Sequence, residues 1–145
     1  ILKYICSLKG LEAADPKKRA LGKSFATYAF DDFCTPHIFK HSLGGAPPDS
    51  QCWKDLLNIH FPAFCKKFDE RLAACGTKYL GGDSITEHDF IVGAMFTNMF
   101  CNPANPMAAQ WKAAMEKCPQ RVKTYGQCFM ADMKPYLDSR PVSPF

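Results

Sequence analysis

Histidine and cysteine side chains between residues 34 and 41 have the types and spacing that could do chemistry. His37 and His41 lie four positions apart, which on one helical face would bring two imidazoles together as metal ligands. Pro36 and the glycine-rich stretch after His41 argue against a stable helix there, and no third ligand has suitable spacing. The sequence therefore predicts no metal site.

Cys34 and His37 also have the residue types of a nucleophile and its general base. The sequence offers no oxyanion donor or orienting acid that can be named beside them, which favours a buried cysteine. His60 falls on an apolar stripe and is interpreted as a hydrogen-bonded core histidine. We predict no catalytic residue in this chain.

Composition and charge narrow the class of protein. The 145 residues are 47% hydrophobic and 22% charged, which is typical of one compact globular domain. The formal charge of +4 is spread along the chain without a long basic block, so we expect no nucleic-acid partner. The longest uninterrupted apolar run, Phe90 to Phe96, is too short to span a bilayer, so we expect no membrane insertion.

The eight cysteines are separated by ten or more positions and include no C-x-x-C pair of the kind found in zinc and redox motifs. Several of them fall on apolar helical faces, where cysteine behaves as a small hydrophobe. A reducing compartment is the simpler interpretation of this pattern, so we expect the protein to be cytoplasmic.

Two helices are predicted in the first part of the chain. Residues 1–8 carry an apolar stripe at helical spacing that ends at a basic residue and a glycine. Asp15 and Pro16 have the capping and first-turn chemistry of a helix start, and the stripe after them continues to Phe33. We expect this second helix to end at Pro36.

Further helices are predicted downstream. Apolar residues recur every three or four positions from Trp53 to Cys75, where Pro62 should kink or split the helix. Residues 102–106 break the chain, Trp111 belongs to the next helix, and Pro119 introduces another. We interpret both tryptophans as packing anchors. No β-alternation appears, so the predicted fold class is all-α.

The segment "GGDSITEHDFIVGAMF", residues 81–96, carries the chemistry of a helix start. Thr86 and Asp89 are placed for a capping box, in which the threonine oxygen accepts the Asp89 amide and the carboxylate accepts the Thr86 amide. Ile85 and Phe90 are placed for a hydrophobic staple across the same turn. The helix that follows is apolar around most of its circumference, so we expect it to run through the core.

Residues 82–90, preceded by Tyr79 and Leu80, resemble the capping-box segment of the C-terminal domain of glutathione transferases. "ILKYICSLKGL" resembles the last helix of that family's thioredoxin-like domain, and "DPKKRAL" resembles the linker and the first long helix. "PQRVKTYGQ" resembles the segment after the penultimate helices, and "YLDSRPVSPF" resembles the sigma-type branch. The resemblance divides the chain into residues 1–11, from an otherwise absent thioredoxin-like domain, and residues 12–145, an all-helical C-terminal domain.

The resemblance implies a glutathione transferase C-terminal-like helical bundle around a buried central helix. It implies that the full-length parent, a cytosolic homodimer with a detoxification role, conjugates glutathione as co-substrate to small hydrophobic electrophiles, or uses it to reduce peroxides or isomerise substrates. Glutathione is held mostly by the thioredoxin-like domain, so this chain would supply the hydrophobic-substrate side and dimer contacts without independent catalysis. His88 stands where the family usually has alanine, and we expect it to be partly exposed.

The resemblance also implies site residues on the first long helix. The family's acidic residue that reaches the partner's glutathione aligns with Thr27 or its neighbours, and Lys23 stands where another acid is common. Asp31 and Asp32 lie one turn away, and a shifted alignment would put one of them at that place. The same helix lines the family's substrate site, which implies four residues here: Phe30, Phe33, Cys34 and His37. Because aromatic stripes usually mean burial, packing in the core or at a dimer contact is the competing and favoured interpretation of the two phenylalanines.

A non-catalytic role is the alternative. Transferase folds are reused as binding or scaffold subunits of larger assemblies, held by protein–protein contacts. Thr27 at the place of the acidic residue, with Lys23 nearby, favours this alternative. Similarity across the substrate-site helix and the sigma-like ending favours the enzyme for the parent protein.

Overall fold

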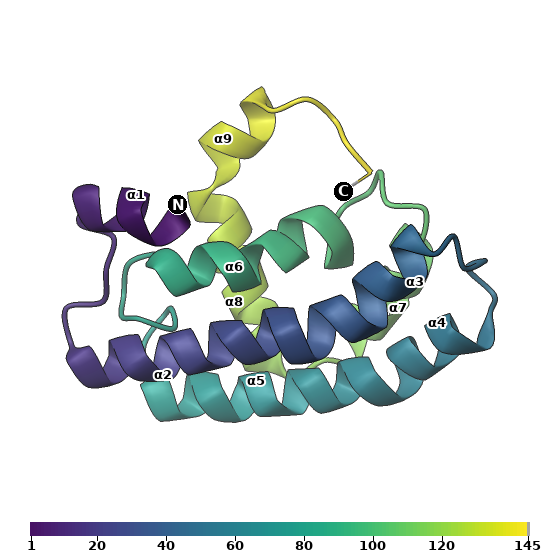
Figure 1. Cartoon of the computed structure of the whole chain (residues 1–145), viewed down its shortest axis with the longest axis horizontal. Coiled ribbons are helices and arrows are strands. Elements are labelled where there is room, and N and C mark those ends of the chain that lie inside the picture. Colours follow the sequence, from purple (N-terminus) through teal and green to yellow (C-terminus); the bar gives the residue numbers. More distant parts are fainter. Residues whose placement is uncertain (145) are drawn as a thin grey trace.

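The chain is all-helical in its computed structural model, which describes residues 1–144 and their side chains except that of Leu43 (Figure 1). No strand occurs among these described residues, in agreement with the predicted fold class. Elements labelled η are π-helical. In chain order the elements are α1 (Leu2–Leu8), α2 (Pro16–Thr27), η1 (Tyr28–Phe39), α3 (Lys40–Leu43), α4 (Gln51–Asp55), η2 (Leu56–His60), α5 (Phe61–Cys75), α6 (Glu87–Met95), η3 (Phe96–Phe100), α7 (Ala108–Glu116), α8 (Gln120–Asp132) and α9 (Lys134–Ser139).

Two long antiparallel rods form one layer of the bundle (Figure 1). The first rod consists of α2, η1 and α3, and the second consists of α4, η2 and α5. The rods contact each other through α2 and α5 and through η1 and η2. Helix α6 packs on α2 from the first rod and also on α8, so it is covered from two sides.

Pro36 does not end the first rod. The sequence predicted a helix end there, and that prediction is wrong, because helical structure continues from α2 through α3. Proline lacks an N–H donor, and its ring crowds the carbonyl group four residues earlier. The rod is π-helical over Tyr28–Phe39, and this wider turn accommodates Pro36. His37 and His41 therefore both lie on helical segments, against expectation.

The second rod accommodates Pro62 in a similar way. Helix α5 begins at Phe61, so Pro62 occupies its first turn, and the π-helical segment η2 comes directly before it. The helical elements follow one another without a gap from Gln51 to Cys75. The predicted split therefore does not occur, and the change in helix type is the local adjustment to the proline.

Stacked aromatic rings fill the space between the rods. Phe33 stacks on Phe64 with ring centroids 4.3 Å apart, and Phe25 stacks on Phe68 at 4.8 Å. Both tryptophans are buried, as predicted. Burying a phenylalanine side chain contributes roughly 1.5–3 kcal/mol to stability, so these rings are a main source of the packing energy between the rods.

The start of α6 is held by the predicted capping box between Thr86 and Asp89. The Asp89 carboxylate accepts the Thr86 N–H at 2.9 Å and the Thr86 hydroxyl at 2.7 Å. It also accepts the Leu80 N–H and the Tyr125 hydroxyl, both at 3.0 Å. Gly81 permits this close approach, since a Cβ atom there would lie 2.5 Å from Thr86 Cγ2. One buried carboxylate thus ties α6 to the preceding loop and to α8.

The rest of α6 and the following η3 run through the core, as predicted. Val92 and Phe96 are fully buried, and Phe100 at the end of η3 is 2% exposed. Ile85 and Phe90, the predicted staple residues, are partly buried and pack against the core.

His88 is buried, with 3% of its surface exposed, so the expected partial exposure is wrong. The physical reason lies on α2, where Gly22 has no side chain. A Cβ atom at Gly22 would come within 2.5 Å of His88 Cδ2. Glycine at this position therefore leaves the room that the imidazole occupies between α2 and α6.

Helix α1 lies beside the start of α6, and the Glu87 N–H donates to the Leu11 carbonyl oxygen at 3.0 Å (Figure 1). The predicted helix is present, but most of its apolar side chains face away from the bundle. The exposed large apolar residues at this end are Ile1, Leu2, Tyr4, Ile5 and Leu8. The division of the chain at residue 11 stays a prediction.

Candidate functional site

Phe33 and Cys34, two of the predicted substrate residues, are enclosed in the core. Phe33 lies in the ring stack on Phe64, and Cys34 is 1% exposed. Burial raises the pKa of the Cys34 thiol to about 12, so Cys34 is protonated at neutral pH. The positions of both residues favour the packing interpretation.

Phe30 has a different environment from Phe33. It lies on the outer side of η1 with 45% of its surface exposed, and its ring meets Phe39 edge-on with centroids 5.7 Å apart. Asp31, the next residue, is also exposed. Phe30 is therefore the predicted substrate residue that the fold leaves free to contact a ligand or a second protein.

His37 stacks on His60 across the two rods, with ring centroids 3.7 Å apart and planes 16° from parallel. Both rings are half-buried, so His60 lies at the edge of the core rather than inside it as expected. Burial lowers the pKa of His37, and the charges that His60 and His41 carry when protonated lower it further. His37 is therefore neutral at physiological pH, and parallel rings do not converge on one metal ion.

Among residues 1–144, no group of three or more histidine, cysteine, aspartate or glutamate side chains is arranged to hold a metal ion. A search of the same residues for a helix with the length and apolar character needed to cross a membrane finds none.

An apolar cavity of about 200 Å³ lies at the far end of the first rod. Phe39, the ring that Phe30 touches, forms part of its wall, and the two buried tryptophans form another part. Ser42 and Asn105 add polar atoms to this otherwise apolar wall. The lining is of the kind that holds small apolar molecules, in which a few polar groups orient the ligand.

Thr27 lines a second small cavity, also of about 200 Å³, between α1, α2 and α6. Lys23 lines it from α2 with Thr27, Lys3 lines it from α1, and the buried side chains of Glu87 and His88 form the α6 side. The structure thus brings Thr27 and Lys23 together at one cavity, while Asp31 is not among the residues that line it.

The second cavity contains buried polar atoms without partners. Glu87 Oε1 lies 3.5 Å from His88 Nε2, which is too long for a good hydrogen bond. Neither Glu87 Oε2 nor His88 Nε2 has a hydrogen-bond partner among the described residues. Burial lowers the pKa of His88, and the negative charges of Glu87 and Asp89 oppose that effect.

This arrangement can bind a polar group. An unpaired buried carboxylate oxygen is costly, so an ammonium or N–H donor placed beside Glu87 would relieve it. Lys3 and Lys23 would favour an anionic group on the same ligand. Sequence reasoning did not find Glu87 as a cavity residue. The available signal was a run of ionisable residues, Glu87, His88 and Asp89, at the start of a helix that is apolar beyond them.

Comparison of the chain with protein-family models, with curated proteins and with solved structures gives no match.

Proposed function

We propose that this chain is the helical part of a glutathione transferase and supplies the hydrophobic-substrate side of its site. The observation that carries the proposal is the path from exposed Phe30 through its edge contact with Phe39 to the apolar cavity that Phe39 lines. An apolar electrophile would be held along this path by burial of its own surface. The same proposal covers peroxide reduction and isomerisation, which need the same apolar surface.

In this proposal a thioredoxin-like domain outside these residues holds glutathione and its thiolate, in a cytosolic homodimer. Conjugation needs a thiol with a lowered pKa and an electrophile held nearby, and this chain would provide only the second. The exposed apolar side chains of α1 support the proposal, because a neighbouring domain packed on α1 would cover them.

The cavity at Thr27 is the proposed place for a contact with glutathione. Glu87 Oε2 would accept a hydrogen bond from an amino group, while Lys3 or Lys23 would pair with a carboxylate. Amino and carboxylate groups at the two ends of a small peptide match this pairing of charges.

The test uses the full-length protein that contains this chain. Retention on immobilised glutathione and elution by free glutathione are expected, together with conjugation of an aryl halide followed by absorbance. Phe39→Ala should raise KM for the aryl halide several-fold and leave KM for glutathione unchanged.

Tyr136→Ala is the matched control, because Tyr136 is an exposed aromatic residue on α9, away from the apolar cavity. It should change neither KM. Protein that flows through the glutathione column without conjugating activity would contradict the proposal.

The alternative is a non-catalytic binding or scaffold subunit, and the exposed apolar side chains of α1 also suit that role. A protein partner docked on α1 would bury Tyr4 and Leu8, so Tyr4→Ser with Leu8→Ser should abolish assembly. Under the transferase proposal the partner surface is a domain of the same chain, and the double variant would instead destabilise that chain.

A further inference from the structure

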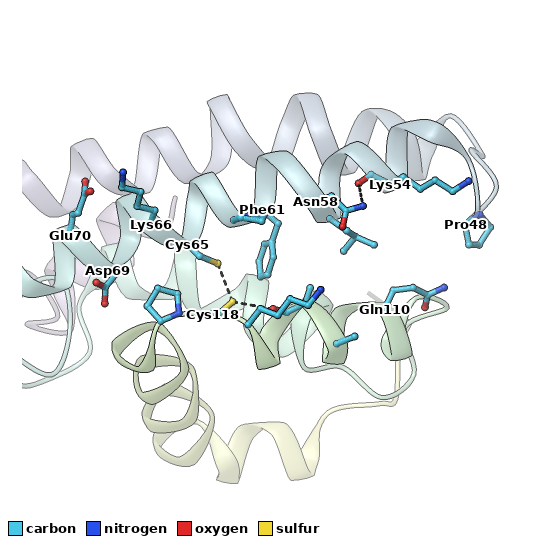
Figure 2. Close-up of a pocket in the computed structure, with 16 residues that line it drawn as sticks. Pro48, Lys54, Asn58, Phe61, Cys65, Lys66, Asp69, Glu70, Gln110 and Cys118 are labelled. Atoms are coloured by element: carbon cyan, nitrogen blue, oxygen red, sulfur yellow. Dashed lines mark hydrogen bonds between the residues drawn. The ribbon is translucent and has the colours of Figure 1, made fainter.

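A groove of about 720 Å³ runs between α5 and α7 and ends at the turn before α8 (Figure 2). Cys65 from α5 and Cys118 from the α7–α8 turn point toward each other in its wall (Figure 2). Lysine side chains from both sides also line it, namely Lys54, Lys66 and Lys117.

The two sulfur atoms are in direct contact. Cys65 Sγ lies 3.3 Å from Cys118 Sγ, although the residues are 53 positions apart in the sequence. Both side chains are largely buried, with 2% and 7% of their surfaces exposed. A lone buried cysteine is a small hydrophobe, but two thiols at this distance are already neighbours for a covalent bond.

The two thiols differ in their electrostatic environment. The hydrogen bond from Cys65 lowers the pKa of Cys118, which burial opposes, and the positive charge of Lys123 lowers it further. The same hydrogen bond, together with burial, raises the pKa of Cys65. Either sulfur can donate in this contact, and the positive charge of Lys123 favours Cys118 as the thiolate.

The charges in the groove support a thiolate there. The groove is lined by three lysines and by two acidic residues, Asp69 and Glu70. Asp69 is already paired with Arg121 at 3.0 Å. The remaining charge is positive, which favours negative charge on sulfur or on a leaving oxygen.

We propose that Cys65 and Cys118 are a redox-active dithiol that a small hydroperoxide entering this groove oxidises to a disulfide. This inference does not rest on the proposed function, because it uses no glutathione and no second domain.

The reaction has two steps. The Cys118 thiolate attacks the outer oxygen of the hydroperoxide, the O–O bond breaks, and the alkoxide leaves as an alcohol after taking a proton. The Cys65 sulfur then attacks the Cys118 sulfenic acid, the S–O bond breaks, and hydroxide leaves as water with the Cys65 proton. The two thiols lose two electrons, and the hydroperoxide gains them.

The experiment treats the whole chain with tert-butyl hydroperoxide and maps thiols by mass spectrometry without reduction. The expected product has lost the mass of two hydrogens and yields one cross-linked peptide pair that contains Cys65 and Cys118. Dithiothreitol should restore the starting mass. The oxidised chain should also melt several degrees higher, because the bond closes a long loop of the unfolded chain.

Single substitutions test the order of the steps. In Cys65→Ala the Cys118 sulfenic acid cannot be resolved, so labelling of Cys118 by dimedone should rise several-fold over the unsubstituted chain. Cys118→Ala should remove the cross-link and leave Cys65 unlabelled. Cys101→Ser, at an exposed cysteine, is the matched control and should form the cross-link normally.

Peroxide treatment and thiol mapping of the unsubstituted chain test the proposal even if a core variant fails to fold. Reduced Cys65 and Cys118 after treatment, or a cross-link that joins Cys101 to either residue instead, would overturn the proposal. Dimedone labelling that moves to Cys65 in Cys118→Ala would overturn the assigned order of attack.

Discussion

The imidazole of His88 lies over Gly22, so close that a Cβ atom on Gly22 would come within 2.5 Å of His88 Cδ2. Gly22→Ala should therefore destabilise the protein, even though alanine favours a helix by about 1 kcal/mol over glycine. Overpacking at a filled contact costs about 1–3 kcal/mol and should outweigh that gain. The free energy of unfolding in urea measures the balance.

The His88→Ala variant provides the control for this contact. In a His88→Ala background the ring is absent, so Gly22→Ala should stabilise the protein rather than destabilise it. If Gly22→Ala has the same effect in both backgrounds, the ring contact does not govern packing between α2 and α6.

Asp89→Ala should destabilise the protein by more than the loss of an N-cap, which costs about 0.5–2 kcal/mol. The substitution removes the acceptor of four hydrogen bonds and leaves buried donors on Leu80, Thr86 and Tyr125. Each orphaned donor costs about 1–3 kcal/mol. Tyr125→Phe removes only one of these hydrogen bonds and keeps the ring. In urea denaturation it should therefore lower the free energy of unfolding by less than Asp89→Ala does.

Phe33→Ala should cost about 3–5 kcal/mol, because it empties a site in the buried ring stack. Phe30→Ala should change stability by no more than about 0.5 kcal/mol, since Phe30 is exposed. Thermal melts of the two variants would show which predicted substrate residue is structural. Equal losses would contradict the different environments of the two rings.

Stability should fall as the pH drops from about 7 to about 5, in part because of His37. Its pKa is lowered in the folded protein by burial and by the nearby His60 and His41, while in the unfolded chain it returns to about 6.5. Below that value the unfolded state binds more protons than the folded state, so acid favours unfolding.

His37→Gln should flatten this pH dependence without reversing it, because the lowered pKa of His88 contributes with the same sign. Urea midpoints measured across the pH range provide the comparison. An unchanged pH profile in His37→Gln would contradict the role assigned to the stacked pair.

The predictions that held depended on local sequence. The capping box needs only Thr86 and Asp89, three positions apart, and the buried α6 follows from its apolar composition. The failures came from a local backbone adjustment in one case and from tertiary packing in the other. The end expected at Pro36 did not allow for a π-helical turn, and the exposure expected for His88 depended on an unseen glycine on another helix.

The candidate site was less predictable than the fold because its residues are brought together by tertiary packing. Thr27 and Glu87 meet only because α2 and α6 pack together. Cys65 and Cys118 lie 53 positions apart, and no local pattern links them. Spacing rules detect neighbours on one helix, whereas these pairs are created by contacts between helices.

The Asp89 carboxylate also constrains how the chain reaches its folded state. The hydrogen bonds from Thr86 and Leu80 to this carboxylate can form as soon as α6 begins. The hydrogen bond from the Tyr125 hydroxyl requires α8 to be docked as well. A partly assembled intermediate that buried α6 without α8 would hold this charge without its full set of donors, at a free-energy penalty. Docking of the two helices is therefore cooperative, and the acid makes intermediates between them unfavourable.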